Sequence, residues 1–133
     1  MVDANLLDQV IKAKRVYLIG NGGSYANAVH ICNDLLGRGI KAYTLDPATL
    51  TASANDFGYE TVFCRWITVV GENGDLLIAL SGSGKSPNIL AAITAAEGKG
   101  MAVYRMFGFG KNMQDAENEQ LVMGHEVYRE LAN

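Results

Sequence analysis

His30 and Asp34 stand four residues apart in a segment whose composition favours a helix. Apolar residues recur at helical spacing from Tyr25 to Leu36, and a spacing of four places both side chains on one face of that helix. An imidazole and a carboxylate in this arrangement can bind a divalent metal ion or act as acid and base. The alternative is an ordinary helical pair in which His30 bonds a neighbouring polar group, and the residues alone favour it.

Residues 79–86, ALSGSGKS, nearly spell the phosphate-binding loop of nucleotide hydrolases, with Ala79 in place of the first glycine. That class also needs an acidic residue at the end of a neighbouring strand to hold Mg²⁺. The next strand, AVYRMF, ends without one, which leaves Asp46 upstream, and Pro87 is unusual at the start of such a helix. Alternating hydroxyl and glycine N–H groups can instead surround one phosphate of a small metabolite. The hydroxyls are those of Ser81, Ser83 and Ser86.

A second glycine-rich loop, GNGGS at residues 20–24, follows an apolar run in the same way. Both loops lie between a strand and a helix, where an open parallel sheet binds ligands and helix N-termini favour anions. A dinucleotide fold would require G-x-G-x-x-G, but Tyr25 stands at the third glycine; Asp46 could still hold a ribose, so this interpretation stays open. The plainer alternative is that Ser24 and Ser86 cap helices and that the glycines only turn the chain.

The order of elements predicts the architecture that positions these loops. The predicted strands are 16–19, 42–45, 76–80 and 102–107, and the predicted helices are 25–36, 61–70, 87–97 and 116–131. Strands that alternate with helices indicate an α/β fold, a three-layer sandwich in which helices flank a parallel sheet of about four strands. We expect a single domain over residues 1–133.

Composition and charge exclude several classes of function. A net charge of −3 and an isoelectric point near 5.3 provide no basic surface for nucleic acid. No run approaches the ~18 apolar residues of a membrane span, and the opening MVDANLLDQV lacks the pattern of a secretory signal. Cys32 and Cys64 are too few and too far apart for a disulfide framework. We therefore expect a cytoplasmic protein with two buried free thiols, which binds neither nucleic acid nor membrane.

Three longer segments carry a family resemblance when they are taken together. They read LIGNGGSYANAVHICNDLLGR, ANDFGYETVFCRW and GDLLIALSGSGKSPNILAAITAAEGKGM, and they cover about residues 16–101. Their order and spacing resemble those of the SIS (sugar isomerase) domain family and, within it, the phosphoheptose isomerases. The resemblance implies a flavodoxin-like or Rossmann-like sheet and a homo-oligomer, dimer or tetramer, with active sites at subunit interfaces. It also implies interconversion of sedoheptulose 7-phosphate and D-glycero-D-manno-heptose 7-phosphate through an enediol, with no nucleotide.

The resemblance also assigns substrate contacts position by position. The family's phosphate-binding serines fall in residues 81–86, and its first loop contributes further contacts from residues 21–24. Its N-D-F-G segment, which contacts sugar hydroxyls, falls on residues 55–58, and an arginine follows the first-loop helix. The implied substrate-binding residues are Asn21, Gly22, Ser24, Arg38, Asn55, Asp56, Ser81, Ser83 and Ser86.

For the chemistry, the resemblance matches His30 to a metal-ligand histidine and Asp34 to a catalytic glutamate. Aspartate is a departure, because its carboxylate is retracted by one methylene, ~1.5 Å. A misplacement of about 1 Å can lower a rate ~10²-fold, so this departure bears on catalytic competence.

The family's last helix supplies a glutamine or glutamate and, about two turns later, a histidine. These fall on Glu117 and His125, whereas a different register would use Gln120 and leave Tyr128 in place of the histidine. We prefer the first register because it keeps a group that titrates near neutral pH. The implied catalytic residues are Asp34 and His125, and the implied ligands of a divalent metal, zinc by ligand type, are His30, Asp34, Glu117 and His125.

Two departures from the family favour a contrasting hypothesis. Few residues precede the first predicted strand, and residues 108–115 leave no room for the further strand that relatives place before their last helix. The chain therefore resembles a shortened SIS domain, whose open sheet edge a partner chain would close. The alternative function is a non-catalytic SIS module that binds a phosphosugar, or a protein partner such as a replication initiator.

Overall fold

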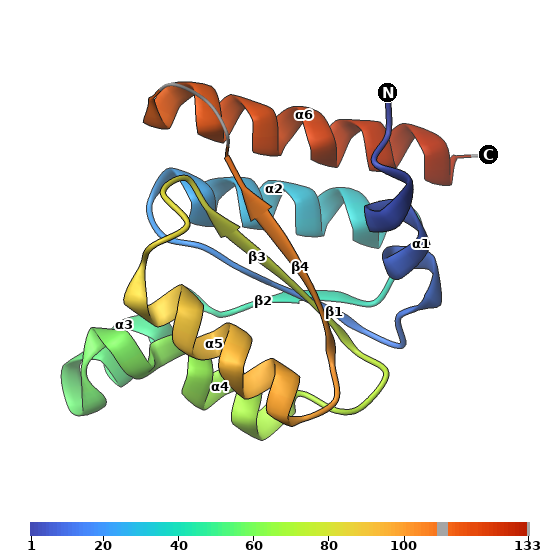
Figure 1. The fold of residues 1–133 in the computed structure, drawn as a ribbon. Helices are drawn as coiled ribbons and strands as arrows, with labels where there is room; N and C mark the ends of the chain where they lie inside the picture. The colour runs from blue at the N-terminus through green and yellow to red at the C-terminus, as the bar shows by residue number, and fades with distance from the viewer. Residues whose placement is uncertain (109–111, 133) are drawn as a thin grey trace.

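A four-stranded parallel sheet forms the centre of the computed structural model, which describes residues 1–108 and 112–132 (Figure 1). Within those residues the order of strands across the sheet is β2-β1-β3-β4, and every neighbouring pair is parallel. The strands are β1 (Val16–Ile19), β2 (Ala42–Thr44), β3 (Leu76–Ser81) and β4 (Ala102–Phe107). The predicted α/β architecture is confirmed.

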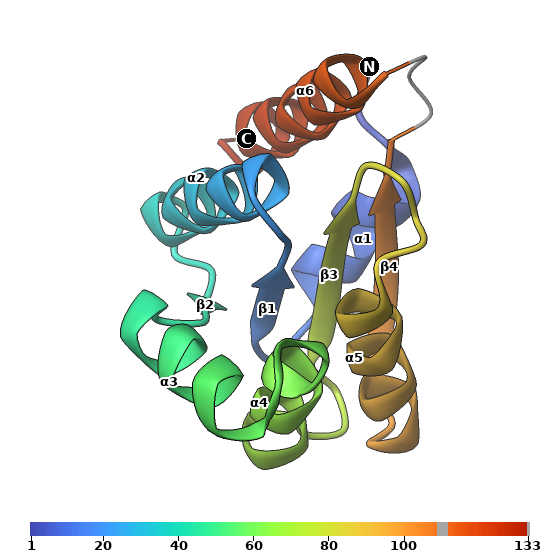
Figure 2. The same ribbon diagram turned by 90° about the vertical axis from the view of Figure 1, so that its left-hand side faces the viewer.

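Helices cover both faces of this sheet, which lies between two helical layers in both ribbon views (Figures 1 and 2). One layer contains α1 (Ala4–Lys12), α2 (Gly23–Gly37) and α6 (Met113–Leu131). The other contains α3 (Pro47–Phe57), α4 (Val62–Val70) and α5 (Pro87–Gly98), with a 3-10 turn, η1 (Tyr59–Thr61), between α3 and α4.

The alternation of side chains along the strands divides the core into two clusters. All six residues of β3 are buried; Leu76, Ile78 and Leu80 pack under α1, α2 and α6. Leu77 and Ala79 point to the opposite face and pack with α4 and α5. Strands buried on both faces read as continuous apolar runs, which is why the sequence identified them.

The helices α1 and α3 were not predicted, and both begin at an aspartate. The Asp3 carboxylate accepts from the backbone N–H groups of the first turn of α1. The Asp46 carboxylate does the same for α3, at 2.9 and 3.3 Å, and Pro47 stands at the first helical position. Residues 47–57, all of them described, include no buried side chain, so no apolar periodicity marked this helix. Asp46 therefore acts as a helix cap, which accounts for it without Mg²⁺ or a ribose.

Other expectations have mixed outcomes. Cys32 and Cys64 are both free thiols, but only Cys32 is buried. No helix among the described residues is long and apolar enough to cross a membrane. The segment expected to lack a further strand includes residues 109–111, which lie outside the described residues.

Candidate active site

The two glycine-rich loops meet at one edge of the sheet. Strands β1 and β3 are parallel neighbours, with Leu18 opposite Ile78 and Ile19 opposite Ala79, so their carboxyl ends deliver both loops to the same place. A small cavity of about 60 Å³ lies between the loops. Its lining residues are Asn21, Ser24, Leu80, Ser81, Gly82, Ser83, Ser86 and Met113. This volume is far below the ~300–1,000 Å³ of sites that enclose drug-sized ligands, so the cavity suits one small group.

The serines of the second loop shape their own turn and keep a donor for a ligand. Ser81 Oγ accepts from the Gly84 N–H at 2.9 Å, and Ser83 Oγ accepts from the Lys85 N–H at 3.1 Å. A hydroxyl that accepts a bond still has its O–H hydrogen to donate. Gly84 has a φ of +69°, a left-handed conformation that glycine adopts without strain. The loop can therefore direct hydroxyl donors at an anion.

Ser86 is the N-cap residue of α5, as the plainer alternative expected, but the structure shows no capping bond from its side chain among the described residues. The first N–H groups of α5 and the positive end of its dipole lie beside this hydroxyl. Position and chemistry at Ser86 thus fit anion binding better than simple capping.

Ser24 is placed differently, because it lies inside α2 and is almost fully buried. The N-cap of α2 is Gly22, with a φ of +55°, so the expectation that Ser24 caps this helix is wrong. The Ser24 hydroxyl donates to Gln120 Oε1 at 3.3 Å and accepts from Gln120 Nε2 at 3.1 Å. Gln120 itself is only 1% exposed and also donates to the Met106 carbonyl. The first loop is thereby bonded to α6.

His30, Asp34 and His125 come together where α2 packs against α6. The two imidazole Nε2 atoms lie 3.2 Å apart, and His30 Nε2 lies 3.4 Å from Asp34 Oδ2. One donor atom from each residue lies within 4.8 Å of the others. Ligand atoms bound at ~2.0–2.1 Å to one tetrahedral metal ion lie ~3.3 Å apart, so the separations of 3.2 and 3.4 Å suit ligands of a shared metal ion.

Close packing of the two helices makes this convergence possible. Gly124, next to His125, lies against Ile31, and a Cβ there would fall 2.5 Å from Ile31 Cγ1. A larger residue would therefore push α6 away from α2. The glycine explains why His125 reaches His30 across the seam.

The register of the last helix is visible in the same seam. Gln120 is buried and bonds Ser24, and the centre of the Tyr128 ring lies 3.6 Å from the guanidinium carbon of Arg38. Neither residue therefore joins the histidine pair. Among the described residues, the group with metal-ligand spacing consists of His30, Asp34 and His125. Of the two residues of the first register, His125 joins the pair. Glu117, however, is not part of that group and lies against Gly23 at the start of α2.

The remaining predicted substrate residues lie away from the serine cavity. Arg38 donates through Nε to the Tyr128 carbonyl at 3.0 Å. Asn55 and Asp56 are exposed at the end of α3, where Asn55 Nδ2 donates to Asp56 Oδ1 at 3.2 Å. Neither residue lines the serine cavity.

A second cavity adjoins the first loop on the side of α3, and its volume is about 230 Å³. Its lining residues are Gly20, Asn21, Gly22, Tyr25, Pro47, Leu50, Thr51 and Tyr59. Tyr25 donates to the Leu45 carbonyl at 2.7 Å, and burial, followed by the nearby Asp46 carboxylate, raises the pKa of Tyr25. Asn21 lines both this cavity and the serine cavity and so separates them.

Sequence reasoning missed two polar residues that hold this site together, Tyr59 and Asn88, and it considered Gln120 only as an alternative metal ligand. Asn88 is 3% exposed and bonds Asn21 across the two loops, and Tyr59 donates to the same asparagine. Their residue types alone give no signal, because each of these bonds joins segments far apart in the chain.

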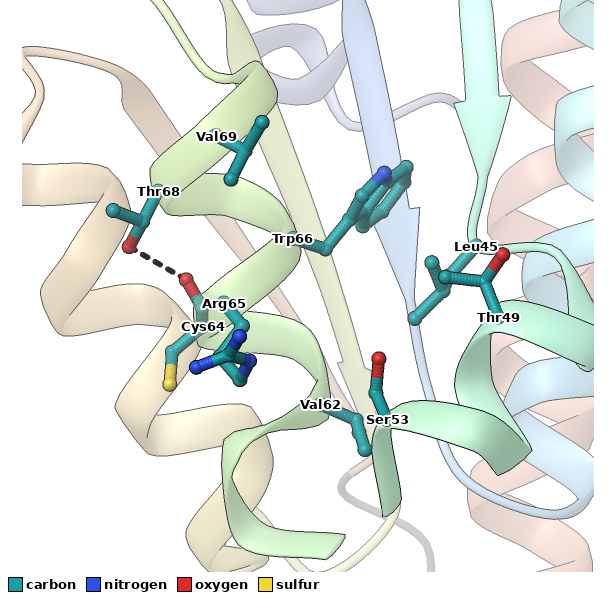
Figure 3. A pocket seen from close by; sticks show the side chains of 9 residues that line it. All are labelled: Leu45, Thr49, Ser53, Val62, Cys64, Arg65, Trp66, Thr68 and Val69. Atoms are coloured by element: carbon teal, nitrogen blue, oxygen red, sulfur yellow. Dashed lines mark hydrogen bonds between the residues drawn. The ribbon is translucent and has the colours of Figure 1, made fainter. Parts of the chain in front are cut away.

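A larger cavity, about 450 Å³, lies between α3 and α4 on the other helical layer (Figure 3). Its lining residues are Leu45, Thr49, Ser53, Val62, Cys64, Arg65, Trp66, Thr68 and Val69. The Thr68 hydroxyl donates to the Cys64 carbonyl at 2.6 Å, which is the dashed bond in Figure 3. This cavity shares no lining residue with the serine cavity or with the histidine pair.

Comparisons with known proteins agree with this fold. Residues 3–108 match the SIS domain family. A phosphoheptose isomerase of Sodalis glossinidius (strain morsitans) is 40% identical over 134 residues, which cover 94% of this chain and 69% of the relative. One from Glaesserella parasuis serovar 5 (strain SH0165) is 40% identical over 110 residues, but the chain spans only 57% of its length. The solved phosphoheptose isomerase of Neisseria gonorrhoeae superimposes with a TM-score of 0.84 at 25% identity, over 96% of this chain and 80% of that one.

Proposed function

The chain belongs to the SIS domain family, and on that premise we propose that it is an aldose–ketose isomerase of phosphorylated sugars. The proposed substrates are sedoheptulose 7-phosphate and D-glycero-D-manno-heptose 7-phosphate, interconverted through an enediol. The relatives at 40% identity carry the name phosphoheptose isomerase, which supports this choice. The observation that carries the proposal is that a serine-lined cavity lies at the first turns of α2 and α6, and that a histidine–aspartate cluster lies further along the same two helices.

The second loop binds the phosphate in this proposal. Ser81, Ser83 and Ser86 supply hydroxyl donors, and the N-terminus of α5 supplies N–H groups and a favourable dipole. A phosphate anchored there fixes the far end of the sugar, so binding energy remote from the reaction orients the reacting carbons.

Asp34 and His125 carry out the proton transfers. One of them removes the proton from the carbon beside the carbonyl, and the other moves protons between the two oxygens of the enediol. The proton that leaves one carbon returns to its neighbour, so no oxidant or reductant is needed. Asp34 is oriented by His30, whose Nε2 lies 3.4 Å from its carboxylate.

His30, Asp34 and His125 would hold a divalent metal, and their spacing fits zinc. Such an ion would polarise the substrate carbonyl. Glu117 stays a proposed fourth ligand, since it lies on α6 two turns before His125.

Further parts of the proposal follow from the family. Residues 1–133 act as one domain, in a dimer or tetramer that completes active sites at subunit interfaces. Arg38, Asn55 and Asp56 would then contact the sugar in the assembled site. The two free cysteines support a reducing, cytoplasmic location.

The test is incubation of the purified protein with sedoheptulose 7-phosphate, with and without added Zn²⁺, while aldoheptose phosphate is followed by NMR and mass. We expect turnover in the native protein and its loss in His125→Ala. Absence of turnover, together with protection of the protein by phosphosugar against thermal unfolding, would overturn the isomerase. That outcome would support the non-catalytic module, which the shorter carboxylate of Asp34 favours.

A further inference from the structure

A reciprocal pair of side-chain amides joins the two glycine-rich loops. Asn21 Nδ2 donates to Asn88 Oδ1 at 2.9 Å, and Asn88 Nδ2 donates to Asn21 Oδ1 at 3.0 Å. Asn21 follows β1, and Asn88 lies in the first turn of α5, 67 residues later in the chain. Two bonds in opposite directions fix both the distance and the relative orientation of the two loops.

A third segment is bonded to the same asparagine. The Tyr59 hydroxyl, at the start of η1, donates to Asn21 Oδ1. A carbonyl oxygen has two lone pairs, so Asn21 Oδ1 accepts from both Tyr59 and Asn88. Tyr59 follows residues 55–58 directly, so this bond ties the end of α3 to the first loop.

The amide pair is costly to disturb, because Asn88 is 3% exposed. A buried amide that loses its partner keeps the full penalty of desolvation. The pair therefore holds one geometry, in which Asn21 stands between the serine cavity and the 230 Å³ cavity beside α3.

We propose that Asn88 and Tyr59 are positioning residues that act through Asn21 and set the distance between the phosphate-binding serine loop and the sugar-contacting end of α3. Asn88 aligns the serine loop, and Tyr59 aligns residues 55–58. The ligand is a phosphorylated open-chain sugar or polyol, which spans the two aligned parts. This inference rests on the proposed function for the phosphate contacts of the serine loop and the sugar contacts of residues 55–58, but it concerns binding and not turnover.

The two residues should differ in what their loss affects. Inorganic phosphate contacts the serine loop alone, so its binding depends on Asn88 and not on Tyr59. A phosphorylated polyol contacts both parts, so its binding depends on both residues. A merely structural role would lower thermal stability and leave both affinities of the folded protein unchanged.

The experiment is calorimetric titration with inorganic phosphate and with glucitol 6-phosphate, which has no carbonyl and cannot be isomerised. Tyr59→Phe should raise the Kd for glucitol 6-phosphate about 3- to 10-fold, as for one lost neutral hydrogen bond, and leave the phosphate Kd within about twofold. Asn88→Ala should raise both constants about 10-fold or more. Tyr43→Phe and Asn5→Ala, at exposed positions away from the loops, are the matched controls.

A double variant tests whether the two residues act through Asn21. In the Asn88→Ala background, Tyr59→Phe should change the glucitol 6-phosphate Kd less than it does in the native protein. Additive effects, or unchanged affinities with a lowered melting temperature, would overturn the proposal. Tyr59→Phe removes only the hydroxyl of a half-exposed residue, so it remains decisive even if Asn88→Ala does not fold.

The same variants separate this inference from the isomerase. If the enzyme turns over, both variants should raise KM for sedoheptulose 7-phosphate while kcat changes less than about threefold. If nothing turns over but the titrations behave as expected, the isomerase fails and the positioning role stands. If the enzyme turns over but the variants do not change the Kd values as expected, the positioning role fails and the isomerase stands.

Discussion

The two glycine-rich loops share a motif, an edge of the sheet and a place before a helix, but their polar side chains are used differently. In the first loop, Asn21 bonds Asn88 and Tyr59, and Ser24 bonds Gln120. In the second loop, the bonds that Ser81 Oγ and Ser83 Oγ accept among the described residues come from the loop's own N–H groups. The first loop is bonded to other segments of the protein, whereas the hydroxyl donors of the second loop are available to the phosphate that we propose it binds.

Packing explains this difference. Helix α6 lies against both loops, but its buried Gln120 turns its amide toward Ser24 of the first loop. The second loop is less covered, and Ser83 is exposed. One motif can therefore serve as scaffold or as binding loop, according to what packs over it.

The largest expected effect lies outside both loops. His125→Ala should lower turnover of sedoheptulose 7-phosphate about 10²- to 10⁴-fold, as for a lost acid–base group, because His125 belongs to the α2–α6 seam. The Kd for inorganic phosphate, measured by calorimetry, should stay unchanged. A large loss of phosphate affinity would show that the seam and the serine loop are not separate parts.

The second effect concerns the serine hydroxyls of the second loop. Ser83→Ala combined with Ser86→Ala should weaken binding of inorganic phosphate at least ~10-fold, since hydrogen bonds to a charged group contribute ~1.5–3 kcal/mol each. The melting temperature should change little, because neither hydroxyl bonds a distant segment among the residues that the structure describes. Ser53→Ala, in the α3–α4 cavity, is the matched control. If the double variant melts at a much lower temperature but binds phosphate as the native protein does, the second loop stabilises the fold and does not bind the phosphate.

The third effect concerns the first loop, which is bonded to α6. Gln120→Ala should lower the free energy of unfolding by about 1–3 kcal/mol, because it leaves the buried Ser24 hydroxyl and the Met106 carbonyl without their partner. Urea unfolding measures this change, and Gln114→Ala, on the exposed side of the same helix, is the control. An unchanged unfolding free energy would mean that the first loop does not depend on α6.

The smallest expected effect is on the pH dependence of stability, and it arises at Asp3, far from both loops. Asp3 caps α1 and accepts from the Tyr104 hydroxyl; this bond, then the backbone N–H of Leu6, lowers the pKa of Asp3. A lowered folded-state pKa contributes stability that is present above the unfolded value, ~3.9, and is lost as pH falls through the folded value.

Unfolding by urea at a series of pH values below about 4.5 should therefore show a slightly steeper loss of stability in the native protein than in Asp3→Asn. Asparagine keeps the cap and removes the titration. Phosphate binding at neutral pH should be equal in the two proteins. Identical pH profiles would show that the carboxylate is not stabilised by these bonds.

The sequence predicted the elements that depend on local pattern. Continuous apolar runs identified β1 and β3, and the serine pattern identified the second loop before any geometry was known. The helix α3 was not predicted, because its cap and its exposed face carry no apolar periodicity.

The site was predicted only where a motif carried it. His30 and Asp34 share a helix, so their spacing was enough. The contact with His125 depends on Gly124, which lets two helices approach; residue type alone could not reveal it, and only the family resemblance led us to expect it. The Asn21–Asn88 pair depends in the same way on two loops that are 67 residues apart.

The absence of buried side chains in α3, whose residues 47–57 are all described, determines how this part of the protein should open. Helices with little buried surface unfold locally at low free-energy cost, so amide hydrogens of α3 should exchange with solvent faster than those of β3. A ligand that bridges the serine loop and the end of α3 would have to order this helix, and part of its binding energy would be spent on doing so. Slower amide exchange in residues 47–57 would then report occupancy of a cavity on the far side of Asn21.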